Sequence, residues 1–206
     1  VELFAYDKFI HKKEDWVNQY SKSTLINFYE EDILSIKNFP KCDYIIHAAS
    51  IASPIFYRKY PLETIDSNVI GLRKLLDLSL EFNPEGILFF STSEIYGNPD
   101  SDNIPTKETY YGNVNSFGPR SCYDEGKKVG ETLCYIYKNY FNSKIKIIRP
   151  FNVFGPLMNK KDYRVIPNII NKINNNQKIL IHGNGRQTRT FCYITDAMIG
   201  FLRVIL

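Results

Sequence analysis

Tyr123 and Lys127 form a pair of residues whose types and spacing could carry chemistry. They lie in the stretch PRSCYDEGKKVGET, residues 119–132, on what we interpret as the first turn of a helix. Residues i and i+4 share one helix face, so the lysine cation would lie near the phenol. A nearby cation lowers the pKa of a tyrosine and makes the phenol a usable general base. A second match, Tyr140 to Lys144, means that the spacing alone is not diagnostic.

Polar side chains at the end of one apolar segment converge on the same place. The hydroxyl and carboxylate residues that end or follow the segment GILFFST (86–92) are Ser91, Thr92, Ser93 and Glu94. In an open parallel sheet, ligands bind beyond the carboxyl ends of the strands. We therefore expect Tyr123 to meet these groups at one edge of the sheet, where the Thr92 hydroxyl would hold the same substrate oxygen as the phenol.

Short β-rich runs alternate with longer helical patterns along the chain. The predicted strands are 1–6, 24–29, 43–49, 86–92, 145–151 and 178–183. Several are apolar almost throughout, which is typical of parallel strands that are covered on both faces. Apolar residues at helical spacing predict helices over 65–82 and 123–141. Strands that alternate with helices indicate βαβ units, so we predict an α/β fold with a parallel sheet.

Residues 97–120 interrupt this alternation with a run rich in Gly, Pro, Asn, Ser and Asp. A loop of this length inside a compact domain is usually functional. From about residue 152 the pattern becomes less regular, as expected of a smaller C-terminal lobe on the substrate side. We therefore predict a cofactor-binding domain over 1–151 and a partial substrate-binding lobe over 152–206.

Composition narrows the functional classes. The net charge is +4 without a polybasic run, so we expect no nucleic-acid partner. The four cysteines form no C-x-x-C and no Cys/His ligand spacing, so we expect no metal site. Buried free thiols, as in a cytoplasmic protein, are the expected state of these cysteines. No apolar run reaches the ~18 residues of a membrane span, so no membrane role is expected.

The motifs quoted above resemble those of the extended short-chain dehydrogenase/reductase family, whose members act on nucleotide sugars. STSEIYG followed by YDEGK looks like the active site of that family, and the likeness covers nearly the whole chain. Four runs most resemble the UDP-glucuronate decarboxylases within it: HAASIASP, GNVNSFGPRSCYDEGKKVGETL, RPFNVFGP and GNGRQTRTFCYITD. The implied fold is a Rossmann-like, doubly wound parallel sheet with a small C-terminal substrate lobe.

The resemblance implies a role for each matching residue. The catalytic residues would be Thr92, Glu94, Tyr123 and Lys127. The residues that bind NAD would be Asp7, Asp32, Ile33, Ala48, Ala49, Asn68, Thr92, Tyr123 and Lys127. The residues that bind the UDP-sugar would be Ser93, Glu94, Arg120, Asn152, Arg164 and Arg189. Asp7 would favour NAD over NADP, because a carboxylate repels a 2′-phosphate, although Lys8 directly after it softens that preference.

The pair Ser93-Glu94 also separates subfamilies. Sugar 4,6-dehydratases resemble this chain but carry Asp-Glu there, because eliminating water requires both an acid and a base. Oxidation of UDP-glucuronate at C4 makes a β-keto acid, which loses carbon dioxide with the ketone as electron sink. The resemblance therefore implies NAD-dependent conversion of UDP-glucuronate to UDP-xylose through a 4-keto intermediate. The alternatives are another nucleotide-sugar 4,6-dehydratase or 4-epimerase, and a non-catalytic member of the family.

Two further expectations come from the resemblance. The family's glycine-rich loop cradles the dinucleotide pyrophosphate and would precede Asp7 by about twenty residues. Since the chain begins at Val1 and ends inside the helical pattern TDAMIGFLRVIL, we expect a sequence truncated at both ends relative to the family. The family helices that match 65–82 and 123–141 pair across a two-fold axis, which predicts a homodimer.

Overall fold

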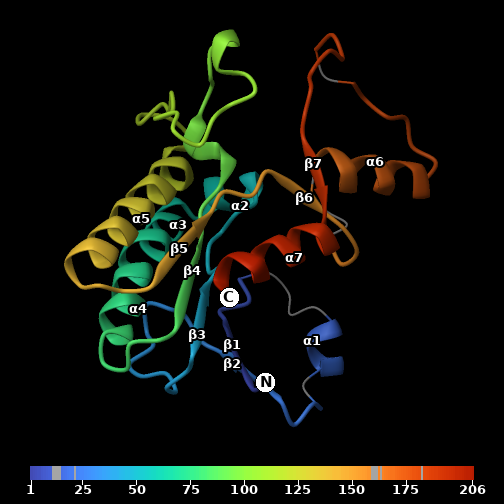
Figure 1. Cartoon of the computed structure of the whole chain (residues 1–206). Coiled ribbons are helices and arrows are strands. Elements are labelled where there is room, and N and C mark those ends of the chain that lie inside the picture. The colour runs from blue at the N-terminus through green and yellow to red at the C-terminus, as the bar shows by residue number, and fades with distance from the viewer. Residues whose placement is uncertain (11–14, 21, 159–161, 163, 182) are drawn as a thin grey trace.

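The structure is a computed structural model that describes residues 1–206 except 11–14, 21, 159–161, 163 and 182 (Figure 1). Its strands are β1 (Leu3–Asp7), β2 (Ile26–Glu30), β3 (Tyr44–His47), β4 (Gly86–Phe90), β5 (Ile145–Ile148), β6 (Asn152–Phe154) and β7 (Phe191–Tyr193). Its α-helices are α1 (Asp15–Tyr20), α2 (Pro54–Lys59), α3 (Pro61–Asp66), α4 (Leu72–Ser79), α5 (Ser121–Tyr140), α6 (Val165–Asn174) and α7 (Ile194–Ile205).

The strands pair in parallel, which confirms the predicted α/β class. β1 pairs with β2, β4 lies between β3 and β5, and β6 pairs with β7. We expected a doubly wound parallel sheet that lacks the family's first strand. Among the described residues the strands form three separate parallel ladders, and β1 and β2 are not hydrogen-bonded to the central ladder of β3, β4 and β5.

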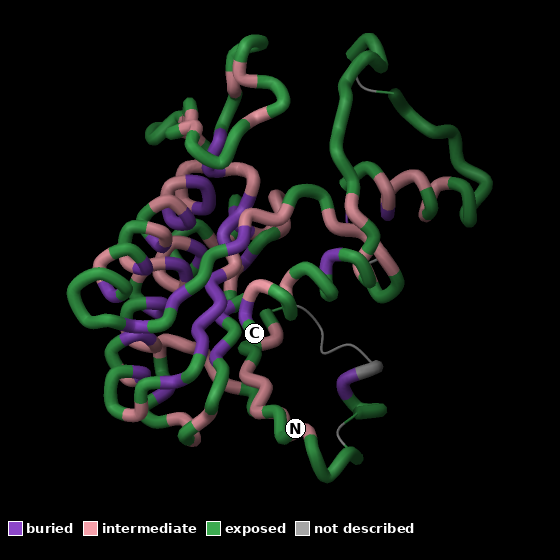
Figure 2. The backbone as a smooth tube through the Cα atoms, in the orientation of Figure 1, coloured by how far each residue is buried: buried purple, intermediate pink, exposed green. Residues whose placement is uncertain are grey.

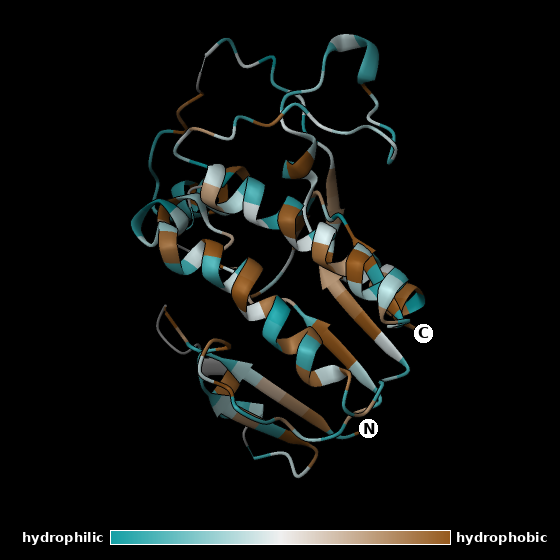
Figure 3. Ribbon diagram, turned by 90° about the vertical axis from the view of Figure 1, so that its left-hand side faces the viewer, coloured by the Kyte–Doolittle hydropathy of each residue, from teal (hydrophilic) through white to brown (hydrophobic). Residues whose placement is uncertain are grey.

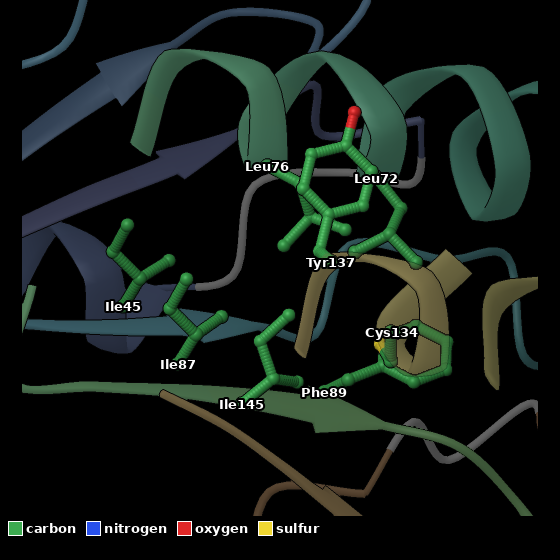
Figure 4. Close-up of a cluster of buried hydrophobic side chains, with 8 residues drawn as sticks. All are labelled: Ile45, Leu72, Leu76, Ile87, Phe89, Cys134, Tyr137 and Ile145. Atoms are coloured by element: carbon green, nitrogen blue, oxygen red, sulfur yellow. The ribbon is translucent and has the colours of Figure 1, made fainter. Parts of the chain in front are cut away.

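The central strand β4 is covered on both faces. On one face, α4 and α5 pack against the sheet through the cluster drawn in Figure 4: Ile45, Leu72, Leu76, Ile87, Phe89, Cys134, Tyr137 and Ile145. On the other face, Leu88 packs with Ile148 and with Ile205 of α7. Successive side chains of a strand point to opposite faces, so the apolar run of β4 supplies both layers. Figure 2 shows that the buried backbone is concentrated in this region.

The helices are amphipathic, and Figure 3 shows hydrophobic and hydrophilic residues alternating along their ribbons. The helix predicted over 123–141 is confirmed as α5. The helix predicted over 65–82 is instead α3, a π-helical turn at Ser67–Gly71, and α4. In that turn the Asn68 side chain donates to the Thr64 carbonyl at 2.8 Å. Such π turns are frequent at functional sites, and Asn68 within this turn is a predicted site residue.

The strand predicted over 178–183 is wrong for the residues that the structure describes there. Residues 178–181 have no regular secondary structure, and residue 182 lies outside the described residues. The side chains of Ile179, Leu180 and Ile181 are exposed, because this apolar run has no neighbouring strand with which to pair. The strand in this part of the chain is β7, which pairs with β6 through the register Val153 to Cys192.

All four cysteines are free thiols, as expected. Burial is confirmed for Cys134, which packs in the core cluster of Figure 4. The expectation of burial is wrong for the other three, which are half-buried at Cys42, Cys122 and Cys192. Apolar neighbours in the local sequence do not guarantee a covering layer in space.

Candidate active site

The carboxyl end of β4 supplies the first part of the site. Thr92 has an extended backbone and caps the short 3₁₀ turn that begins at Ser93, and its hydroxyl accepts from the Glu94 amide at 3.3 Å. The Ser93 amide donates to the Pro150 carbonyl at 3.0 Å, which ties this turn to the segment after β5. A capping hydroxyl satisfies an amide that the turn leaves open, so Thr92 holds the strand end in a defined conformation.

The first turn of α5 supplies the phenol. Tyr123 is 8% exposed and its ring stacks on Tyr57 at a centroid distance of 5.3 Å and an interplanar angle of 10°. The Thr92 side chain lies close enough to the phenol to lower its pKa, so the strand end and the helix start do meet. The predicted convergence of Thr92 and Tyr123 is therefore present in the structure.

The predicted direction of the Tyr123 pKa is wrong for this structure. Burial raises the pKa of Tyr123. The Thr92 side chain and the positive charge of Arg164 lower it, but they only partly oppose that rise. The expected cation is not close enough to reverse it, because Lys127 Nζ lies 6.0 Å from the phenol ring centroid. The ammonium donates instead to the Phe90 carbonyl at 2.6 Å.

Lys127 is a buried cation. It is 2% exposed, and its Nζ lies 5.0 Å from the ring centroid of Phe89. Desolvation penalises the charged form of a buried lysine. Burial accordingly lowers the pKa of Lys127 to about 7. His47, at the end of β3, is also buried, and burial together with the Lys127 charge lowers its pKa to about 3.

Glu94, Arg120 and Asp124 form a charged group beside Tyr123. Arg120 lies directly before α5, and its guanidinium donates both to the Glu94 carboxylate and, at 3.3 Å from Nε, to Asp124. Burial opposes the positive charge on Arg120, but the two carboxylates outweigh that cost and its pKa is raised. Burial raises the pKa of Asp124 despite its ion pair. An arginine held by two acids can orient one of them toward a ligand.

The chain returns to α5 through the long loop 97–120, whose base is closed by two glycines. Gly97 has φ +63°, and a Cβ atom there would lie 1.9 Å from the Asn113 carbonyl oxygen. Gly112 has φ +90°, and a Cβ atom would lie 2.1 Å from the Ile95 carbonyl oxygen. Only glycine fits such close approaches at positive φ. Among described residues, the loop contains a short 3₁₀ turn at Ser101–Asn103 and is otherwise irregular, as predicted.

The residues assigned to the adenosine end of NAD lie at the ends of β1 and β2. Asp7 is the last residue of β1 and is exposed, and Asp32 follows β2 and pairs with Lys8 at 2.6 Å. Ile33 packs against the π turn, where a Cβ atom on Gly71 would lie 2.7 Å from Ile33 Cγ2. Parallel strands end at the same edge, so these residues share one side of the ladder.

The residues assigned to the middle of NAD follow β3. Ala48 and Ala49 are exposed directly after His47. Buried polar atoms without a hydrogen-bond partner among described residues are the His47 ring nitrogens, Ser50 Oγ and Asn68 Oδ1. Buried polar groups require partners, so these atoms fit a polar ligand such as a dinucleotide. When bound, such a cofactor would be held by Asp7 at one end and by Lys127 and the Thr92 and Tyr123 hydroxyls at the other.

The residues assigned to the nucleotide sugar are spread over the C-terminal part. Arg164 precedes α6 and pairs with Asp162 at 2.6 Å, and its charge lowers the pKa of Tyr123. Asn152 begins β6, and its side chain donates to the Thr190 carbonyl at 3.0 Å. Arg189 is exposed, and its guanidinium donates to the neighbouring Thr188 carbonyl at 2.7 Å. The substrate roles of Arg164, Asn152 and Arg189 stay predictions.

One cluster at the site was missed by the sequence interpretation. Arg149 makes a two-pronged ion pair with Glu131 of α5, at 2.9 and 2.7 Å, and donates to the Tyr96 hydroxyl at 3.0 Å and to the Glu108 carbonyl at 2.7 Å. Glu131 also accepts from the Ser91 hydroxyl at 2.6 Å. The cluster joins β4, α5, the segment after β5 and the long loop. Glu131 lies four residues after Lys127, on the same helix face, and this spacing was the available signal.

The described residues contain neither a metal site nor a membrane span. Among them, no three His, Cys, Asp or Glu side chains gather in an arrangement that could hold a metal ion. In that same part of the chain, no helix is long and apolar enough to cross a membrane.

Known proteins resemble this chain in sequence and in fold. The model of the NAD dependent epimerase/dehydratase family matches residues 9–206. UDP-glucuronic acid decarboxylase 6 of Arabidopsis thaliana is 44% identical over 167 residues, which are 81% of this chain and 48% of that protein. The chain therefore spans about half the length of that relative.

Two solved structures share the fold. UDP-glucose 4-epimerase of Thermotoga maritima superimposes with a TM-score of 0.84 at 22% identity, covering 98% of this chain and 64% of the other. UDP-N-acetylglucosamine 4-epimerase of Methanobrevibacter ruminantium, in complex with UDP-N-acetylmuramic acid, superimposes equally well at 25% identity, covering 98% of this chain and 64% of the other. Together with the family match over most of its length, these likenesses mean that the chain belongs to the NAD-dependent epimerase/dehydratase family.

Proposed function

We propose that this chain is part of an NAD-dependent enzyme that decarboxylates UDP-glucuronate to UDP-xylose. The observation that carries the proposal is that the buried Tyr123 phenol and the buried Thr92 side chain meet at the edge of the sheet, beside the Glu94–Arg120–Asp124 group. The 44% identity to a UDP-glucuronic acid decarboxylase supports the choice of reaction. A hydroxyl pair of this kind suits the removal of a proton from a sugar alcohol during its oxidation.

When bound, NAD would supply a reversible hydride acceptor for C4 of the sugar, and the chain's own residues would move the protons. Tyr123 takes the C4 hydroxyl proton, and the Thr92 hydroxyl holds the same oxygen. The C4 ketone then accepts the electron pair that the departing carbon dioxide leaves behind, and a proton is added at C5. In the return step Tyr123 gives its proton back to the C4 oxygen. Burial raises the pKa of Tyr123, so it favours the protonated phenol that starts this return step, and it opposes the first proton transfer, for which the phenol acts as the base.

Glu94 and the arginines around it are the proposed sugar-side groups. Arg120 holds the Glu94 carboxylate, and we assign Glu94 to positioning the sugar or to proton transfer at C5. Because Arg120 already binds Glu94 and Asp124, its direct role as a partner of the substrate carboxylate would require exchange with those acids. Arg164, whose charge acts on Tyr123 and which pairs with a single acid, is the other cation that we assign to an anionic substrate.

Two variants with the same chemical change test this assignment. Tyr123→Phe removes the buried phenol and should reduce turnover of UDP-glucuronate by at least about a hundredfold, which is the usual contribution of a general acid–base group. Tyr140→Phe is the matched control, because Tyr140 begins the second Tyr-x-x-x-Lys match and is exposed at the end of α5. Equal turnover in both variants would refute the assignment.

A second candidate is a nucleotide-sugar 4-epimerase or 4,6-dehydratase. It is favoured by the similarity to a UDP-N-acetylglucosamine 4-epimerase at 25% identity. The pair Ser93-Glu94, in place of Asp-Glu, argues against the dehydratase. Epimerisation would leave the carboxylate of UDP-glucuronate in place, so release of carbon dioxide separates the two activities. A non-catalytic member of the family would give neither product.

We also propose the organisation of the molecule. Residues 1–151 would bind NAD and residues 152–206 would contribute to the nucleotide-sugar site, with α7 returning to cover β4. A homodimer through the outer faces of α4 and α5 is supported by apolar side chains that remain exposed on or beside them: Ile70, Leu80, Val129, Tyr135 and Tyr140. Sedimentation of the protein at several concentrations tests this assembly.

A further inference from the structure

Lys8 and Asp32 lie beside the residue that is expected to select the cofactor. β1 ends at Asp7 and β2 ends at Glu30, and the Glu31 amide donates to the Asp7 carbonyl at 3.1 Å. Lys8 and Asp32 therefore leave the ladder at the same edge, where their side chains pair at 2.6 Å. In dinucleotide-binding folds, a cation near this acid accommodates a 2′-phosphate. The sequence offers Lys8 as such a cation, but in the structure its ammonium is already paired with Asp32.

The conformation of Asp32 is independent of Lys8. Asp32 Oδ1 accepts from the Leu34 amide at 3.0 Å in a local turn, and Oδ2 faces Lys8. Burial disfavours the ionised carboxylate, but the hydrogen bonds from Lys8 and Leu34 outweigh burial and the pKa of Asp32 is lowered. The turn thus holds the Asp32 carboxylate beside Lys8, whose side chain is half exposed.

The other described cation near Asp32 is also bound. Lys74 of α4 donates to the Leu34 carbonyl at 2.8 Å, on the far side of the same turn. Asp7 keeps its own turn, in which Oδ1 accepts from the Phe9 amide at 2.7 Å. Lys8 and Lys74 are therefore both held by other groups, while Glu30 lies opposite Asp7 in the ladder and Glu31 follows it.

We infer that Asp32 is a specificity-determining residue that withdraws Lys8 from the adenosine 2′ position and so makes the site select NAD against NADP. The inference rests on the proposed NAD-binding function and goes beyond it. From the sequence, Lys8 was expected to weaken the preference for NAD that Asp7 creates. Asp32 acts twice, since it holds the lysine and adds a second negative charge near a 2′-phosphate.

Binding of NAD⁺ and NADP⁺, measured by isothermal titration calorimetry, tests this inference without turnover. Asp32→Asn keeps an oxygen acceptor for the Leu34 amide but removes the charge. We expect it to tighten NADP⁺ binding about tenfold relative to NAD⁺, from release of a surface ion pair and loss of one repulsive charge. The added substitution Lys8→Met should remove the part of that gain that comes from the released lysine. Glu2→Gln, which makes the same charge change beside the opposite end of β1 and keeps an oxygen acceptor for the Asn27 side chain, should leave the ratio unchanged.

Three results would overturn the inference: an unchanged ratio in Asp32→Asn, a gain of the same size without Lys8, or an equal gain in Glu2→Gln. Each of these requires that NAD⁺ binds, so the proposed function would stand. A protein that binds neither dinucleotide would overturn the proposed function and the inference together.

Discussion

Replacing Lys127 by methionine should change how the stability of the protein depends on pH. The pKa of Lys127 falls from 10.5 to about 7 on folding because the ammonium is buried. Between these two values the unfolded chain binds more protons than the folded one, so the free energy of unfolding rises with pH. Methionine has a similar length and no charge, so the variant lacks this dependence while filling much of the same space.

The size of the effect follows from the two pKa values. Each pKa unit corresponds to about 1.4 kcal/mol, so burial of the charge costs about 4 kcal/mol at pH 7 and about 2 kcal/mol at pH 9. The Met variant also loses the hydrogen bond to the Phe90 carbonyl, but that loss does not vary with pH. The difference in unfolding free energy between Lys127→Met and the unchanged protein should therefore shrink by about 2 kcal/mol from pH 7 to pH 9.

Urea unfolding followed by far-ultraviolet circular dichroism at several pH values measures this difference. The control is Lys138→Met, which removes a lysine from an exposed position of the same helix. Its stability curve should run parallel to that of the unchanged protein. Parallel curves for Lys127→Met as well would refute the reasoning, because they would mean that the ammonium keeps its solvation in the folded state.

The remaining predictions concern packing and the missed cluster. Gly130→Ala should destabilise the protein by about 1–3 kcal/mol in thermal unfolding, because its Cβ atom would lie 2.5 Å from Phe89 Cζ. Gly200→Ala is the same change in α7, where the added Cβ atom would have no neighbour within 4 Å, so it should stabilise the protein by about 0.5–1 kcal/mol. A Gly200→Ala variant that is less stable than Gly130→Ala would contradict the packing. Arg149→Leu should cost about 2–4 kcal/mol in urea unfolding because it leaves the half-buried Glu131 unpaired, and adding Glu131→Leu should recover part of that loss. A double variant that is no more stable than Arg149→Leu alone would contradict the role of the unpaired charge.

General rules of sheet architecture predicted the meeting of Thr92 and Tyr123. Thr92 lies beyond the carboxyl end of β4 and Tyr123 lies at the start of α5, and parallel strands bring such positions to one edge of the sheet. The spacing of Tyr123 and Lys127 predicted a shared helix face, but it carried no information about burial. Burial is what lowers the pKa of Lys127 and raises that of Tyr123, so the electrostatics of the pair came from the covering layers and not from the local sequence.

Non-local pairing explains the other differences. The run at 178–183 is as apolar as a strand, but pairing depends on a partner, and β6 pairs instead with the less apolar β7. The Arg149–Glu131 ion pair joins residues from two elements, and a single sequence does not identify such partners. The π turn at Ser67–Gly71 likewise depends on the Asn68 side chain and the packing of Ile33, which helical periodicity does not reveal.

The most direct test of the proposed reaction is identification of the product. The protein would be incubated with NAD and UDP-glucuronate in deuterated water and followed by proton NMR. We predict UDP-xylose with one solvent deuteron at C5, no net NADH, and no product from Tyr123→Phe. Unchanged UDP-glucuronate, or its C4 epimer with the carboxylate retained, would contradict the proposal.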